Sequence, residues 1–212
     1  MAKTDGEKAL GDLYNKTRKD PFVVDVPAMN FLMIDGEGDP NVSKAFREAV
    51  ETLYGVSYGA KFVIKKREAA RDYKVSALEG LWWSKGAAGF DWGKRAEWLA
   101  KRDEWLWTAM IMQPAAVAAK VVEDASEALR KKGKGPALAK MRFESFHEGL
   151  SVQMLHIGPY AEEPATVAKM MEFARSEGYE LTGKHHEIYM GDPRRSAPEK
   201  LKTILRHPVR KA

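Results

Sequence analysis

Residues 151–178 read SVQMLHIGPYAEEPATVAKMMEFARSEG, and this stretch decides the fold because an apolar strand gives way to an amphipathic helix. The strand breaks at a glycine, an acidic turn with a proline follows, and the helix is predicted to end at Gly178, as glycine often lies just past a helix end. Residues 29–55, MNFLMIDGEGDPNVSKAFREAVETLYG, repeat this order and give a second predicted helix end at Gly55. The sequence therefore predicts an architectural repeat of two strand–helix units.

The two predicted helices carry matching apolar faces, with residues spaced three or four apart. These are Phe46, Val50 and Leu53 in the first helix, and Val167, Met170 or Met171, and Ala174 in the second.

Strand candidates follow each helix: residues 73–83 and 104–112 in the first half, residues 183–190 and 202–210 in the second. Residues 62–66 fit either a strand or the tail of the first helix. Pro198 suits a single helical turn before the last strand. Between the halves, residues 114–133 form a predicted helix with Pro114 in its first turn and Gly133 at its end, and residues 141–150 lead through a Glu148-Gly149 turn into the second unit.

The predicted fold class is α+β, with two pseudo-symmetric strand–helix–strand–strand modules, antiparallel sheets and a ligand cleft between the modules. A polar segment spans residues 1–20 and one domain spans 21–212. Module one covers about 21–113, the connecting helix 114–133, and module two about 140–212.

The composition excludes several classes of function. The 212 residues include no cysteine, which rules out disulfides, thiolate zinc sites and cysteine nucleophiles. The net charge of +5 is mild and scattered, with its densest clusters at 131–135 and 206–211. A solvated surface explains these clusters better than a nucleic-acid site, since no recognition helix or zinc finger accompanies them. No secretory signal or long apolar run is present, so we expect a cytoplasmic protein with no membrane contact.

All six tryptophans lie between residues 82 and 107. Any one of them could fill a core, but Trp82 and Trp83 point to opposite faces of one strand, so we expect some of the cluster to line a pocket. Flat aromatic walls bind planar ligands by stacking and bind cations through the ring quadrupole. The segment 84–103 could form a lid over such a pocket or a plain surface excursion.

The stretch HHEIYM, residues 185–190, alternates as a strand does, which places His185, Glu187 and Tyr189 on one face. Glu187 is either an exposed residue paired with a lysine or a carboxylate inside the aromatic cleft. In a cleft, desolvation would disfavour its charged form, so it would attract a cationic ligand or act as a general acid or base.

Glutamates also lie in two other predicted strands, at Glu79 and Glu144, and this number raises the expectation that at least one faces a pocket. His156 is most simply a hydrogen-bonded histidine at the edge of the core. Because the adjacent His185 and His186 point opposite ways, no metal site is expected. No cofactor is expected either. Nucleotide-binding glycine loops and a hydrolase serine motif are absent from the sequence.

Four segments resemble the GyrI-like small-molecule-binding domain proteins: LEGLWW (78–83), WLWTAMIMQP (105–114), VQMLHIGPYAEEPATVAKM (152–170) and HHEIYMGDPRRSAPEKLKTILRHPV (185–209). The resemblance extends from about residue 20 onward. It implies two strand–helix–strand–strand modules around a central aromatic channel. Relatives include the gyrase inhibitory protein and the effector-binding domains of multidrug-sensing regulators, in which a glutamate matching Glu187 receives lipophilic cations.

Some members similar to this chain are cyclopropanoid cyclopropyl hydrolases, which open the strained ring of DNA-alkylating compounds by adding water. The resemblance implies catalytic roles for Glu187, Glu144 and Tyr189. It also implies a set of ligand-binding residues: Trp82, Trp83, Trp107, Met110, Phe146, Met154, His156, Tyr160 and His185.

The expected partners are planar hydrophobic or cationic small molecules. Direct DNA binding is not expected, because only about 20 polar residues precede the domain. The alternatives are a non-catalytic multidrug-binding protein or sensor, and a protein-binding regulator in the manner of the gyrase inhibitor.

Overall fold

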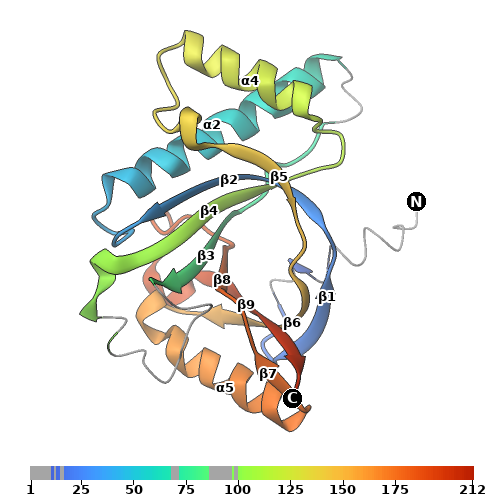
Figure 1. The fold of residues 1–212 in the computed structure, drawn as a ribbon, viewed down its shortest axis with the longest axis vertical. Helices are drawn as coiled ribbons and strands as arrows, with labels where there is room; N and C mark the ends of the chain where they lie inside the picture. Colours follow the sequence, from blue (N-terminus) through green and yellow to red (C-terminus); the bar gives the residue numbers. More distant parts are fainter. Residues whose placement is uncertain (1–10, 12, 15–16, 68–71, 86–96, 98–99) are drawn as a thin grey trace. The chain divides into compact units, whose positions relative to one another are not determined.

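The computed structural model describes the chain except for residues 1–10, 12, 15–16, 68–71, 86–96 and 98–99 (Figure 1). The chain divides into two compact units, Met1–Pro27 with His147–Ala212, and Ala28–Phe146. Most of the predicted lid, including Trp92 and Trp98, lies outside the described residues.

The first unit is built on an antiparallel sheet whose strands lie in the order β1, β6, β9 and β8, with β7 also paired to β9. Its strands are β1 (Phe22–Val26), β6 (Gly149–Ile157), β7 (Tyr179–Leu181), β8 (His185–Tyr189) and β9 (Lys202–Lys211).

Helix α5 (Glu163–Ser176) packs against β6 and β7. Its buried residues, Glu163, Val167, Met170 and Ala174, follow the predicted spacing. Pro164 lies in its first turn, where proline costs no hydrogen bond, and Gly178 ends it with a φ of 73°. The predicted helix and its end are therefore confirmed, as is the short turn at Pro198–Lys200.

The second unit contains an antiparallel sheet in the order β3, β4, β2 and β5. Its strands are β2 (Met29–Glu37), β3 (Leu78–Ser84), β4 (Trp105–Gln113) and β5 (Arg142–Phe146). Helix α2 (Lys44–Arg67) packs on β2 and β4, and helix α4 (Ala119–Lys131) lies along α2 (Figure 1).

The predicted end of the first helix at Gly55 is wrong, because α2 continues to Arg67 and residues 62–66 form its last turns. Gly55 and Gly59 instead let α4 approach closely. A Cβ at Gly55 would lie 2.9 Å from Leu129 Cδ2, and one at Gly59 would lie 3.0 Å from Ala125 Cβ. Glycine here serves helix packing rather than helix termination.

The predicted start of the connecting helix at Pro114 is also wrong. Residues 114–118 form a turn in which Val117 N–H donates to the Pro114 carbonyl, and α4 begins at Ala119. The α+β class and the strand–helix–strand–strand order of each unit are confirmed, since α2 lies between β2 and β3–β4 and α5 between β6 and β8–β9. The first unit adds the three-residue strand β7 directly after α5.

Each unit also gains an edge strand from the other half of the sequence: β1 pairs with β6, and β5 pairs with β2. Across the described residues, no helix is both long and apolar enough to pass through a membrane.

Candidate functional site

Strand β8 carries His185, Glu187 and Tyr189 on one sheet face, as the alternation predicts. The β8–β9 register places Leu205 opposite Glu187 and Thr203 opposite Tyr189. Helix α5 brings Glu163 to this group from its first turn. We call Glu163, His185, Glu187 and Tyr189 the carboxylate site.

Glu187 is the centre of the carboxylate site, with 13% of its side chain exposed. The Tyr189 hydroxyl donates a hydrogen bond of 2.8 Å to Glu187 Oε2. His185 Nε2 lies 3.2 Å from Glu187 Oε1. One carboxylate oxygen therefore faces a phenol and the other an imidazole, and each oxygen retains a further lone pair for a ligand or a water.

A second carboxylate stands beside the first. Donor atoms of Glu163, His185 and Glu187 all lie within 4.8 Å of one another, and Glu163 is 6% exposed. Tyr160 approaches the same group, its ring 5.9 Å from that of Tyr189 at an edge-to-face angle of 81°. The arrangement offers two carboxylates, two phenols and an imidazole for proton transfer, cation binding or metal ligation.

Burial and the nearby carboxylates keep both phenols protonated. Burial, followed by the charges of Glu187, Glu163 and Asp192, raises the pKa of Tyr160 to about 12. Burial and the Glu187 charge raise the pKa of Tyr189 well above 10. Tyr189 therefore remains a hydrogen-bond donor to Glu187 across the physiological pH range.

His207 continues this face, its ring centroid 5.2 Å from that of His185. Burial, and then repulsion from His185, lowers the pKa of His207 to about 3, so His207 is neutral at pH 7.

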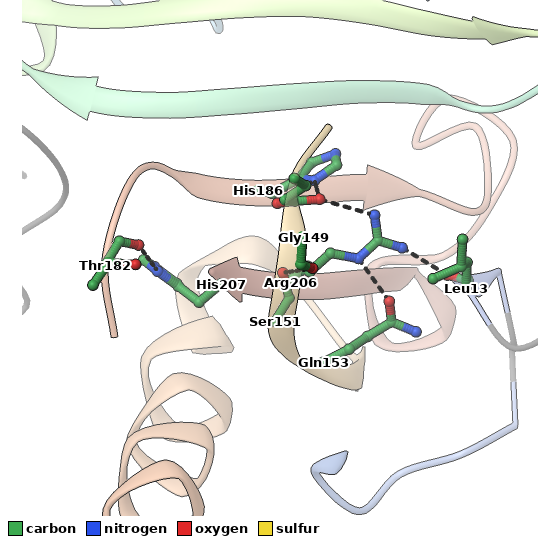
Figure 2. Close-up of polar contacts among 9 residues, drawn as sticks. Leu13, Gly149, Ser151, Gln153, Thr182, His186, Arg206 and His207 are labelled. Carbon is green, nitrogen blue, oxygen red and sulfur yellow. Dashed lines mark hydrogen bonds and ion pairs between the residues drawn. The ribbon is translucent and has the colours of Figure 1, made fainter. Parts of the chain in front are cut away.

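The other face of the same strands holds a buried ionic network. Glu148 receives an ion pair from His186 Nδ1 at 2.9 Å and one from Arg206 Nη1 at 3.1 Å. Figure 2 shows the Arg206 guanidinium also donating to Gln153 Oε1 at 2.8 Å and to the Leu13 carbonyl at 2.9 Å.

Burial acts to raise the pKa of Glu148, but the charges and hydrogen bonds of His186 and Arg206 outweigh it and hold the pKa at about 2. The expectation that the basic cluster 206–211 is solvated is wrong for Arg206 and His207, which are 0% and 1% exposed. Strand β9 runs between two other strands there, and the guanidinium is satisfied by buried acceptors.

Two other candidates of this unit, Met154 and His156, lie on the same sheet face as Glu187. His156 hydrogen-bonds Thr166 Oγ1 at 2.8 Å and the Pro159 carbonyl at 3.2 Å, as expected of a histidine at the core edge. Met154 is 7% exposed and stands opposite Leu205 on the sheet face of Glu187.

The second unit contains a buried aromatic cluster against α2. Phe46 packs on Trp82 and Trp107 with ring centroids 5.8 and 5.0 Å apart, and Trp82 contacts Trp105 at 6.0 Å. Trp82 and Trp107 are 3% and 1% exposed, so both are buried within this unit.

Trp83, Met110 and Phe146 belong to a separate cluster around Phe31, Met33 and Leu81. The residue alternation of β3 puts this cluster on the sheet face opposite Trp82, as the sequence predicts for Trp82 and Trp83. The candidate residues of the second unit thus divide between two faces.

Glu144 and Glu79 meet opposite environments. Half of the Glu144 side chain is exposed, and Arg142 Nε donates to it at 2.8 Å. Glu79, in contrast, is 0% exposed.

Sequence reasoning did not identify Glu163 or the Glu148 network. A signal for Glu163 exists, because it stands four residues before Val167 and so belongs to the apolar face of α5. The partners of Glu148 lie 38 and 58 residues away along the chain, and no local pattern connects them.

Comparison with known proteins identifies relatives over nearly the whole chain. A hydrolase from Listeria innocua is 40% identical with a TM-score of 0.80, and the match covers 98% of this chain and 100% of that one. An uncharacterized conserved protein from Listeria innocua is 43% identical with a TM-score of 0.84 and the same coverage.

The C-terminal domain of EcmrR, at 10% identity and a TM-score of 0.52, shares the fold over 91% of this chain and 98% of that domain. A search of the curated proteins finds no match. Residues 105–210 match the model of the GyrI-like small molecule binding domain. With its two strand–helix–strand–strand units, the chain belongs to the GyrI-like small-molecule-binding family.

Proposed function

We propose that this protein binds planar, hydrophobic and often cationic small molecules at the carboxylate site and hydrolyses cyclopropane-bearing electrophiles among them. The observation that carries the proposal is Glu187, a largely buried carboxylate held between Tyr189 and His185 beside a second carboxylate. The similarity to a Listeria innocua hydrolase supports hydrolytic chemistry.

Glu187 acts as the general base in this proposal. It accepts a proton from water as the water oxygen bonds to a cyclopropane carbon. The strained carbon–carbon bond breaks, its electron pair passes into the carbonyl conjugated with the ring, and that carbonyl system gains a proton. The net change is the addition of one water molecule, and no redox partner is required.

The neighbours of Glu187 position it for this step. Tyr189 remains protonated and fixes one oxygen, while His185 holds the other, so the carboxylate keeps one orientation. Two adjacent carboxylates also favour a positively charged ligand.

Tyr160, 39% exposed, offers an aromatic surface next to Tyr189 on which a planar ligand can stack. Trp82, Trp83, Trp107, Met110, Phe146, Met154 and His156 remain predicted ligand contacts, and Glu144 remains a predicted catalytic residue.

The test is to incubate the purified protein with a cyclopropane-bearing alkylator in H₂¹⁸O and to follow the hydrated product by mass spectrometry. We expect ¹⁸O-labelled product and a loss of at least about 100-fold in rate for Glu187→Gln. Glu180→Gln, which removes an exposed glutamate of the same unit, serves as the matched control and keeps the parent rate.

Turnover by Glu187→Gln at the parent rate would refute the proposed mechanism. Quenching of protein fluorescence by a rhodamine, without any turnover, would instead support a non-catalytic binder.

A further inference from the structure

We propose that Glu163, His185 and Glu187 form a binding site for a divalent transition-metal ion such as Zn²⁺. One donor atom from each residue lies within 4.8 Å of the other two. The residues come from two elements, with Glu163 at the start of α5 and the other two on β8. An imidazole and two carboxylates are ligands that Zn²⁺ accepts, and three protein ligands leave a fourth position open.

The distances fit a metal-binding geometry. With metal–ligand bonds of about 2.0 to 2.2 Å, tetrahedral ligands stand about 3.4 Å apart. His185 Nε2 and Glu187 Oε1 are already separated by 3.2 Å. A donor atom of Glu163 lies within 4.8 Å of both.

The surroundings of the three residues also favour a cation. Glu163 and His185 are 6% and 2% exposed, so they are largely removed from solvent. Two carboxylates held this close in a buried place repel one another unless a proton or a cation lies between them.

A separate observation points to a further group at the site. The Thr203 hydroxyl is 1% exposed and has no hydrogen-bond partner among the described residues. The register places Thr203 opposite Tyr189, on the sheet face that carries Glu187. A water or ion bound on this face would give this hydroxyl a partner.

The proposed metal site shares Glu187 with the proposed function but does not depend on turnover. Small-molecule binding without the ion can be tested by measuring rhodamine binding to protein that a chelator has stripped of metal. The two proposals can therefore fail separately.

The experiment is calorimetric titration of the full, metal-stripped chain with Zn²⁺. We expect one ion per chain, and affinity at least about tenfold lower in both Glu163→Gln and His185→Gln, since each loses one ligand. Glu162→Gln is the matched control, because it removes the same charge from the exposed neighbouring residue, and it should bind as the parent does.

A second readout reports on geometry. Co²⁺ in place of Zn²⁺ should give the strong visible absorption of a tetrahedral site in the parent and in Glu162→Gln, and lose it in His185→Gln. Absence of Zn²⁺ binding by the parent would overturn the proposal, as would unchanged affinity in Glu163→Gln. If Glu163→Gln does not fold, as judged by circular dichroism, unchanged affinity in His185→Gln overturns it equally.

Discussion

Replacing Glu148 by glutamine should remove a large part of the acid sensitivity of this protein. The carboxylate of Glu148 is 1% exposed and is bound by His186 and Arg206. Glutamine preserves the size of the side chain but leaves the buried guanidinium without its counter-charge. Removing one partner of such a buried pair costs about 3 to 5 kcal/mol, and we expect this loss at pH 7.

The pH dependence follows from the lowered pKa of Glu148. Its value falls from the ordinary 4.5 to about 2 in the folded protein. At about 1.4 kcal/mol per pH unit, this difference corresponds to about 3 kcal/mol. Because the unfolded chain takes up the proton first, the stabilisation is complete above about pH 5 and is lost as the pH falls towards 2.

The assay is urea denaturation at a series of pH values from 7 to about 2, followed by far-ultraviolet circular dichroism. The tryptophans lie between residues 82 and 107, whereas Glu148 belongs to the other unit, so tryptophan fluorescence is the less direct probe. The parent should lose about 3 kcal/mol more than Glu148→Gln between pH 5 and 2.

The matched control is Glu180→Gln, which breaks the exposed pair with Arg210 and should change stability by less than about 1 kcal/mol. If the free energy of unfolding fell equally with pH in the parent and in Glu148→Gln, the buried network would not control acid unfolding.

Two further predictions concern packing and phenol ionisation. Gly36→Ala would place a Cβ 2.2 Å from Trp107 Cζ2, so we expect a loss of about 1 to 3 kcal/mol and a shifted tryptophan emission. Gly11→Ala, where nothing lies within 4 Å, should show neither, and an unperturbed Gly36→Ala protein would contradict the packing described. Spectrophotometric titration of the folded protein to about pH 11 should leave at least three of the seven tyrosines un-ionised. The three are Tyr73, Tyr160 and Tyr189, whose pKa values are raised first of all by burial. Ionisation of all seven tyrosines near pH 10 would contradict this burial.

The sequence by itself determined the class of fold and the composition of one strand face. Apolar spacing defined the buried face of α5, and alternation placed His185, Glu187 and Tyr189 together, as their contacts confirm. Both patterns are local, since the period of a helix or strand fixes which side chains share a face.

Glycine was harder to interpret. At Gly178 it ends a helix with a positive φ, whereas Gly55 lies inside α2 against Leu129. The same residue type serves both purposes, and only the presence of α4 distinguishes them.

Tertiary structure alone decided which charged groups meet. It brought Glu163 to Glu187, buried Arg206 between Glu148, Gln153 and Leu13, and left Glu144 exposed beside Arg142. Burial and ion pairing arise from strand register and helix docking between segments far apart in the chain. A local pattern carries no information about such distances, and they set the protonation of each group.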